Sequence, residues 1–289
     1  MRIFDRKKRL ATILPGSILA LIWPGLILAS PAPALSLDSV PTLVIFTPIS
    51  VEWDPRDQTL WVADQYLPRI AHANAEGAPL SVFAASRYGG GRPAGVAFDA
   101  SGAGHLFISD PDASRIVRVD LAGNPAGAIG TAGLGLGNPA DLAWDVRDGS
   151  LFVADPTARA VFHLAVTDAN GDGDPDGATL IGSFSTIPLN SDNPMGLALD
   201  PGSGHLFLSD PALDRVFELD ASGSLIASFD TGMVGGTSVT GLAWEAPGAR
   251  LHLADAARKL LREEMERAFP LAVPLKVSLG SGRSWAELG

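Results

Sequence analysis

The stretch GVAFDASGAGHLFISD, Gly95–Asp110, is one of five related segments in this chain. The others are SVEWDPRDQTLWVAD (Ser50–Asp64), DLAWDVRDGSLFVAD (Asp141–Asp155), GLALDPGSGHLFLSD (Gly196–Asp210) and GLAWEAPGARLHLAD (Gly241–Asp255). An acidic residue recurs at one place in every segment, the acidic landmark, in steps of 45, 46, 55 and 45 residues: Asp54, Asp99, Asp145, Asp200 and Glu245. The Asp that ends each segment is the second landmark: Asp64, Asp110, Asp155, Asp210 and Asp255. A period of this length predicts stacked supersecondary units.

Each unit contains short apolar runs separated by turn residues. In the second unit these are VAF, LFIS and RIVRV, followed by a weaker fourth run. Runs of this kind, bounded by Gly, Pro, Asp and Ser, predict strands, and four strands at this period describe a propeller blade. Helical solenoids would need apolar residues spaced at three and four, which are missing. We therefore predict an all-β fold over residues 35–255, a β-propeller with four full units and a partial fifth.

The units resemble the NHL-type six-bladed propeller repeat, in which a G-I-A-V-D … I-Y-V-A-D … R-I-x-x-F-D pattern recurs. The residues that carry the resemblance are Gly95–Asp99, Leu106–Asp110 and Arg115–Asp120, and their counterparts in the other units. The resemblance covers residues 50–255. It implies a binding platform, or a lyase or lactonase of the kind found among related propellers, because one fold carries many functions.

The N-terminus has the pattern of a secretory signal. Five basic residues precede an apolar run from Ala11 to Ala29, which Ala32-Pro33-Ala34 follows as a small-residue cleavage pattern. The alternative is a membrane anchor, but Pro-Gly pairs interrupt the run, and a spanning helix needs ~20 apolar residues. We predict a signal peptide over residues 1–34, a secreted or periplasmic protein, and no membrane association beyond the signal.

The charge limits which classes of partner the chain can bind, and the cysteine content decides whether it can form disulfides. Residues 35–255 contain ten Arg, no Lys and 27 acidic residues, a net charge of −17. Such a surface repels phosphate backbones, so nucleic acid is excluded as a partner of this part. The chain has no cysteine and hence no disulfide. The partner we predict is a protein or small ligand on a propeller rim, of unknown identity.

The long third step contains the acidic stretch DANGDGDPDG, Asp168–Gly177. Two overlapping registers match a D-x-[DN]-x-[DN]-G calcium loop, and calcium needs six to eight oxygen ligands. An ordinary helical calcium hand is excluded, because the closing Glu is missing and no helices flank the loop. The loop resembles those in hairpins of integrin-type propellers, or the tandem loops of dockerin-type and thrombospondin-type repeats. We predict a structural calcium site rather than a solvated linker, with the ligands Asp168, Asn170, Asp172, Asp174 and Asp176.

No catalytic residue is predicted. An Asp at the same place in every unit is what a structural turn requires, since its oxygens accept hydrogen bonds from turn amides. The histidines at 72, 105, 163 and 205 occupy repeated strand positions without a repeat-breaking cluster around them. The alternative function is a calcium-dependent lactonase or lyase. It requires non-equivalent groups to converge at the channel mouth, and the candidates are Glu52, Asn138, Asp141 and Asn193.

The repeat stops at Asp255, and residues 256–289 form a different segment. Its first part has helical spacing and Val273–Leu279 alternates like a strand. Residues 257–285 resemble the extreme C-terminus of bacterial family A DNA polymerases, through Arg262–Glu266, Pro270-Leu271, Val273–Leu275, Gly280, Gly282 and Trp285. The polymerase's metal-binding carboxylates are missing, so we predict no polymerase activity and a fusion or sequence join. Either Val273–Leu279 or Leu43–Phe46 could complete the last blade.

Overall fold

The computed structural model describes residues 48–75, 79–234, 236–246, 250–255, 259–260 and 276–279. The predicted signal peptide, the segment Leu43–Phe46 and most of the tail lie outside these ranges. Within them the strands form five sheets. This is one sheet fewer than the ring of the NHL-type repeat.

Each of the first four sheets is an antiparallel meander whose strands follow one another in sequence, and each is one blade. Blade 1 contains β1 (Pro48–Asp54), β2 (Thr59–Asp64), β3 (Arg69–Asn74) and β4 (Pro79–Ala84). Blade 2 contains β5 (Val96–Asp99), β6 (His105–Asp110), β7 (Arg115–Asp120) and β8 (Pro125–Gly130). Blade 3 contains β9 (Leu142–Asp145), β10 (Ser150–Asp155), β11 (Ala160–Thr167) and β12 (Gly177–Ser185). Blade 4 contains β13 (Leu197–Leu199), β14 (Leu206–Asp210), β15 (Arg215–Leu219) and β16 (Leu225–Asp230).

Blade 5 is built differently from the others. Its first strands are β17 (Val239–Glu245) and β18 (Arg250–Asp255), which pair antiparallel. Two short strands from the tail, β19 (Lys259–Leu260) and β20 (Lys276–Leu279), share the outer edge of β18. The expected substitution of the tail strand for the missing one is thus confirmed for its last four residues, which pair parallel to β18. Lys259–Leu260 form a strand where the spacing predicted a helix.

Short 3-10 helices make the connections. They are η1 (Ala85–Tyr88), η2 (Pro111–Ala113), η3 (Ala132–Leu134), η4 (Ile187–Leu189) and η5 (Thr231–Val234). In the part of the chain that the structure describes, no helix has the length and apolar character needed to cross a membrane.

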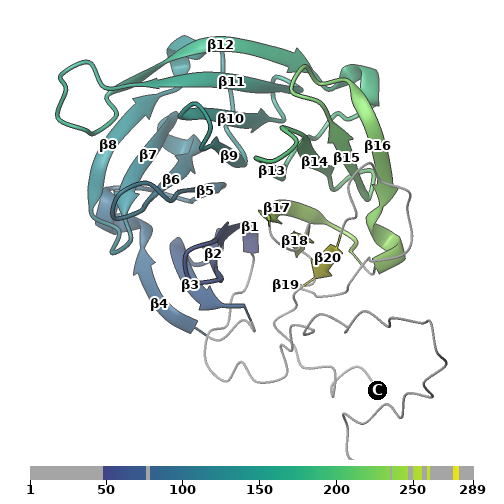
Figure 1. Ribbon diagram of the computed structural model, residues 1–289, viewed down its shortest axis with the longest axis horizontal. Coiled ribbons are helices and arrows are strands. Elements are labelled where there is room, and N and C mark those ends of the chain that lie inside the picture. The colour runs from purple at the N-terminus through teal and green to yellow at the C-terminus, as the bar shows by residue number, and fades with distance from the viewer. Residues whose placement is uncertain are drawn as a thin grey trace, which may run out of the picture. The chain divides into compact units, whose positions relative to one another are not determined.

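The sheets radiate from a common axis, with β1, β5, β9, β13 and β17 innermost (Figure 1). Each innermost strand contacts that of the next blade, and β17 contacts β1. The contact between the fifth and first blades repeats the chemistry of the others. Trp53 of β1 stacks on His252 of β18 with centroids 5.1 Å apart, as Trp144 stacks on Phe107 at 4.9 Å across blades 2 and 3. The described strands therefore close a ring, and the fold is a β-propeller.

Apolar side chains fill the spaces between neighbouring blades. One cluster joins blades 1 and 2, another joins blades 2 and 3, a third joins blades 3 and 4, and a fourth joins blades 5 and 1. The aromatic residue at the middle of the second strand is fully buried at Trp61, Phe107, Phe152 and Phe207. Because aromatic rings bury the largest apolar area per residue, these four side chains dominate the stabilisation of the core.

The recurrent aspartates lie at strand ends and hold turns, as predicted. Asp54, Asp99, Asp145 and Asp200 each accept a hydrogen bond from the amide two residues on. The second landmark ties a blade to the segment that enters it. Asp155 Oδ2, for example, accepts from the amides of Gly137 and Asn138 at 2.6 and 2.9 Å.

Candidate functional site

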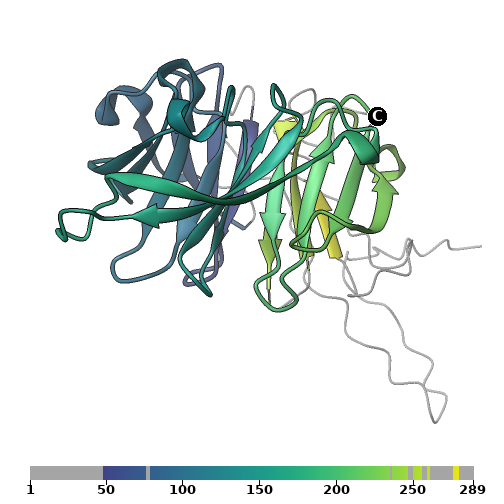
Figure 2. The same ribbon diagram turned by 90° about the horizontal axis from the view of Figure 1, so that it is seen from above.

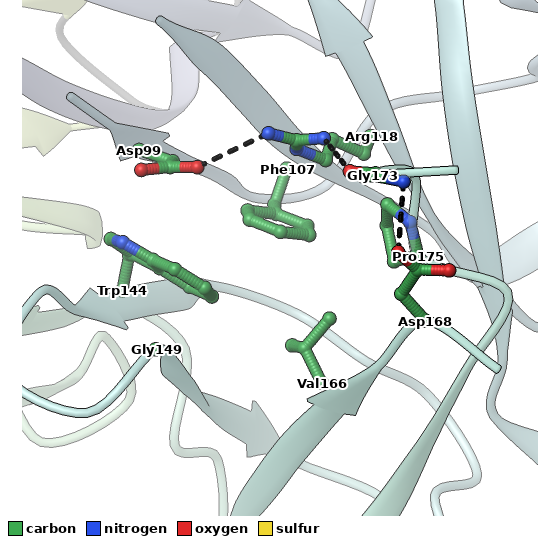
Figure 3. A pocket seen from close by; sticks show the side chains of 9 residues that line it. All are labelled: Asp99, Phe107, Arg118, Trp144, Gly149, Val166, Asp168, Gly173 and Pro175. Carbon is green, nitrogen blue, oxygen red and sulfur yellow. Dashed lines mark hydrogen bonds and ion pairs between the residues drawn. The ribbon is translucent and has the colours of Figure 1, made fainter. Parts of the chain in front are cut away.

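A pocket of about 180 Å³ opens between blades 2 and 3, near the acidic loop (Figure 3). We call it the rim pocket. It is lined by Asp99, Phe107, Arg118, Trp144, Gly149, Val166, Asp168, Gly173 and Pro175. Four of these residues come from the loop and its preceding strand end, so the extension of the third unit forms one wall of the pocket.

Aromatic rings form the middle of the rim pocket. Phe107 of β6 is 1% exposed, whereas Trp144 of β9 is half-buried. The two rings stack with an interplanar angle of 24°. Aromatic faces carry partial negative charge, so a stacked pair at the side of a pocket favours planar or cationic ligands.

Arg118 of β7 links blade 2 to the acidic loop. Its Nη1 donates to the carbonyl of Gly173 at 3.0 Å and lies 3.5 Å from Asp174 Oδ1. Its Nη2 lies 3.4 Å from Asp99 Oδ2 and 2.9 Å from His105 Nδ1. The guanidinium therefore offsets part of the acidic charge that the loop brings to this rim.

The acidic loop, Asp168–Gly177, is also anchored by its backbone. The amide of Ala128 in β8 donates to the carbonyl of Pro175 at 2.9 Å, and Pro175 is buried. A Cβ on Gly127 would collide with Pro175, so glycine allows the loop to approach this closely. The β11–β12 hairpin thus leaves its own blade and reaches the outer strand of blade 2 (Figures 1 and 2).

The five predicted calcium ligands all lie in this loop, where four of them accept hydrogen bonds from the loop's own amides and Asp174 faces Arg118. Asp168 accepts from the amides of Gly171 and Gly173, which hold the pKa of its carboxyl below the usual range. Asn170 accepts from Asp172, Asp172 from Asp174, and Asp176 from Ala169. Among the described residues, no three His, Cys, Asp or Glu side chains stand close enough together to hold a metal ion.

The propeller axis holds a different carboxylate, that of Asp141. This residue stands four positions before the acidic landmark of its unit, where the other units have Ser50, Gly95, Gly196 and Gly241. Its side chain is 1% exposed. A Cβ on Gly95 or Gly241 would collide with the backbone of the neighbouring innermost strand, so the blades meet too closely for further side chains at this level.

Asp141 is bonded to several blades at once. Its Oδ1 accepts from the hydroxyl of Ser50 in blade 1 at 2.7 Å and from the amide of Leu142 at 3.0 Å. Its Oδ2 accepts from the amides of Leu197 in blade 4 and Leu242 in blade 5, at 3.0 and 3.4 Å. The axis thus presents converging N–H groups, and Asp141 supplies the acceptor for them.

Burial dominates the protonation of both axial acids. It raises the pKa of Asp141 to about 8, against the opposing effect of the hydroxyl and amide donors. Glu52, two residues after Ser50 on β1, is half-buried where the other units have Ala97, Ala143, Ala198 and Ala243. Burial raises the pKa of Glu52 well above its usual range, and the Asp141 carboxylate adds to this shift.

The remaining candidates for an axial site serve the backbone. The amides of Asn138 and Asn193 donate to the second-landmark carboxylates Asp155 and Asp210 at 2.9 and 3.0 Å. Sequence reasoning flagged Asp141 because it breaks the repeat. It missed that the partners of its carboxylate are backbone amides, which no residue pattern displays.

The histidines pair with side chains across strands. His72 Nε2 lies 2.7 Å from the hydroxyl of Thr59, and His163 Nε2 lies 2.7 Å from that of Ser150. Ser150 donates its proton to Asp148, and in this arrangement its oxygen accepts from His163. A catalytic triad needs the acid on the far nitrogen of the histidine instead. Burial lowers the pKa of His72, His105 and His163.

No protein-family model matches the chain, and no curated protein matches it. Solved structures do. A chain from a nidogen–laminin complex aligns with a TM-score of 0.51 and 21% identity, over 72% of this chain and 72% of that chain. Glutaminyl cyclase of Myxococcus xanthus aligns with a TM-score of 0.51 and 14% identity, over 76% of this chain and 87% of that one. At these identities the likeness shows the fold alone, and that fold serves both binding proteins and enzymes.

Proposed function

We propose that the protein is a secreted or periplasmic NHL-type propeller that acts as a non-catalytic binding module and takes its ligand on the rim. The hydrogen bonds of Asp141 carry this proposal. Both of its oxygens are bonded to donors from other blades, so this side chain links the blades across the axis. A metal on the axis would have to displace those donors, whereas the rim pocket is open and lined by aromatic and charged groups.

One observation favours an enzyme as the second candidate. Glu52 breaks the repeat beside the axis, and burial raises its pKa. A raised pKa keeps the carboxyl protonated, as a general acid of a lactonase or lyase must be. The experiment is an assay of the purified protein against a panel of lactones and cyclic esters, with calcium and with chelator. We expect no turnover. Turnover that disappears in a folded Glu52→Gln variant would establish the enzyme in place of the binding module.

We also propose that calcium binds the acidic loop and orders it. Clustered carboxylates repel one another, and a divalent cation relieves this cost. Arg118 reaches Asp174 and the carbonyl of Gly173, which leaves the side chains of four predicted ligands for the cation: Asp168, Asn170, Asp172 and Asp176. Calcium must draw these oxygens closer together than they lie here. It would thereby tighten one wall of the rim pocket.

The calcium site is tested by thermal unfolding with calcium and with chelator. We expect calcium to raise the melting temperature of the wild type and not that of Asp172→Ala. Asp192→Ala is the matched control, because Asp192 is an exposed acid outside the loop that pairs only with the exposed Arg159 in the described residues. It should respond to calcium as the wild type does. Identical melting curves of the wild type in calcium and chelator would exclude the site.

Export and the tail complete the proposal. Sequencing of the mature N-terminus is expected to place cleavage after Ala34, and the protein in the exported fraction. The polymerase-like segment, residues 257–285, has no catalytic part in this function. Removing it is expected to destabilise blade 5, since β20 pairs with β18.

A further inference from the structure

Arginine side chains bridge successive blades at a repeated position, two residues after the acidic landmark. In blade 1, Arg56 donates from Nε and Nη2 to the two oxygens of Asp54 at 3.1 and 2.9 Å. Its Nη1 donates to the carbonyl of Ala103 in blade 2 at 2.9 Å. Its Cζ lies 4.5 Å from the centroid of the Phe98 ring, also in blade 2. The guanidinium is thus held by a carboxylate, a carbonyl and an aromatic face.

Blade 3 repeats the bidentate bonds to the carboxylate and the close approach to a glycine of the next blade. Arg147 donates from Nε and Nη2 to the two oxygens of Asp145 at 2.8 and 2.6 Å. Its Nη1 would lie 2.7 Å from a Cβ placed on Gly204 in blade 4, the counterpart of Gly104 beside Arg56. Two interfaces between blades are therefore each filled by a guanidinium from the protein itself.

Blade 2 lacks this arginine and has Ser101 in its place. The local backbone is the same: the backbone amide of Ser101 donates to Asp99 Oδ1 at 2.9 Å, and the backbone amide of Arg147 donates to Asp145 Oδ1 at the same distance. Across the interface Trp144 takes the place of Phe98, and Gly149 that of Gly104. Asp99, Trp144 and Gly149 all line the rim pocket. The pocket is thus the space that a guanidinium fills at the other two interfaces.

In the described part of blade 2, no other side chain makes the pair of forked bonds to Asp99 that the arginines make to Asp54 and Asp145. Asp99 Oδ2 has its contact with Arg118 at 3.4 Å, longer than the forked bonds of Asp54 and Asp145. In blade 4, where Gly202 stands at this position, the hydroxyl of Ser203 donates to Asp200 Oδ2 at 2.7 Å. The larger ring of Trp144 takes up part of the space, with its edge 3.8 Å from a Cβ placed on Gly149. A pocket remains beside it.

We propose that the rim pocket binds an alkylguanidinium group, the side chain of an arginine that a partner polypeptide presents. Its planar fork matches the carboxylate of Asp99 while its face stacks on Trp144, and a guanidinium does both better than an ammonium. Asp168 in the pocket wall and Asp174 beside Arg118 leave the site acidic despite Arg118. The net charge of −17 over residues 35–255 favours the approach of a cationic partner. This inference rests on the proposed binding role and names its ligand class.

The probe is N-acetyl-L-arginine methylamide, titrated into the full-length protein by calorimetry. Its neutral isostere, the citrulline derivative, has the same shape without the charge. Saturable binding of the arginine probe is expected, with the citrulline probe at least about tenfold weaker. Equal binding of the two probes, or no binding to the folded wild type, would overturn the inference. Propylguanidine carries the same single charge on an alkyl stem without peptide groups, so tighter binding of propylguanidine than of the arginine probe would overturn the polypeptide as the source of the guanidinium.

Substitutions locate the site. Ser101→Arg supplies the tethered guanidinium of blades 1 and 3, so it is expected to abolish probe binding and to raise the melting temperature. Ala221→Arg adds the same charge on an exposed turn of blade 4 and should leave binding unchanged. Trp144→Leu, which copies Leu199 of blade 4, is expected to weaken binding about tenfold. A Ser101→Arg variant that binds the probe like the wild type would refute the pocket. Failure here leaves the lactone assay unaffected, so the two proposals fail separately.

Discussion

Asp141 and Ser50 lie 91 positions apart in the chain and share a hydrogen bond of 2.7 Å at the propeller axis. Ser50 Oγ in turn accepts from the amide of Val96 at 3.0 Å. With the amides of Leu197 and Leu242, the pair connects all five blades through two side chains. Ring closure therefore depends on a polar centre as well as on the apolar layers between blades.

Replacing Asp141 by Asn tests this centre. The amide keeps the shape of the carboxyl group but brings two N–H donors where the protonated carboxyl has one O–H, and among the surrounding backbone N–H groups this leaves buried donors unpaired. We expect the free energy of unfolding to fall by about 1–3 kcal/mol, measured by urea denaturation. Asp192→Asn removes a carboxylate from an exposed ion pair, and a change below about 1 kcal/mol is expected there. Equal stability of the two variants would mean that the axial bonds contribute nothing.

The pKa of Asp141, raised to about 8 by burial, predicts a pH dependence of stability. An unfolded Asp titrates near ~3.9, so between about pH 4 and 8 the folded state holds a proton that the unfolded state does not. The free energy of unfolding therefore falls as pH rises through this window. Histidines with pKa values lowered by burial act in the opposite direction near their own range.

Comparison with Asp141→Asn isolates the carboxyl, because Asn does not titrate. The stability gap between wild type and variant is expected to be largest near about pH 4 and to narrow steadily toward about pH 8, above which it stays constant. Urea denaturation at several pH values measures it. A gap that stays constant or widens with pH would show that the carboxylate is charged throughout.

Close approach at the axis gives a third prediction. A Cβ on Gly241 would collide with the backbone of Ser50 and Val51, which cannot move without shifting blade 1. Gly241→Ala is expected to destabilise the ring by at least about 1–3 kcal/mol. Gly182→Ala is the control, because it places a Cβ in open space on the outer strand β12 and should be neutral or stabilising by up to about 1 kcal/mol. Similar melting temperatures for both variants would contradict the ring closure described here.

Most of the fold could be predicted from the sequence repeat. Because matching letters recur in each unit, the strands and their turns followed from the sequence, and Asp54 and its counterparts hold turns as expected. The closure of the ring did not follow from the sequence. It depends on the contacts of β1 with β17 and on the stacking of Trp53 on His252, which replaces the Phe107 partner of Trp144 by a histidine. The tail strand was one of two alternatives for completing the last blade, and the structure pairs its last four residues with β18.

The candidate site was harder to predict for a related reason. The sequence marked the acidic loop by its length and its carboxylates. It did not show that the loop crosses to blade 2, since that contact is made by the backbone of Pro175 and Ala128. At the position of Arg118 the other units have His72, His163 and Glu218, so the repeat by itself indicates no particular role for this side chain. What decides its role is the neighbouring loop, which only one unit has.

Arg118 is therefore expected to couple the acidic loop to blade 2. Arg118→Met keeps the buried stem but removes the bonds to Gly173, Asp99 and His105. We expect a loss of about 1–3 kcal/mol, because Asp99 stays buried with its charge less compensated. Hydrogen exchange at the amides of residues 168–177 should accelerate at the same time. Arg215→Met is the matched control at an exposed strand position, where Arg215 bonds Ser228 at 3.3 Å. Unchanged exchange in the loop of Arg118→Met would show that the backbone bond from Ala128 to Pro175 is sufficient to hold it.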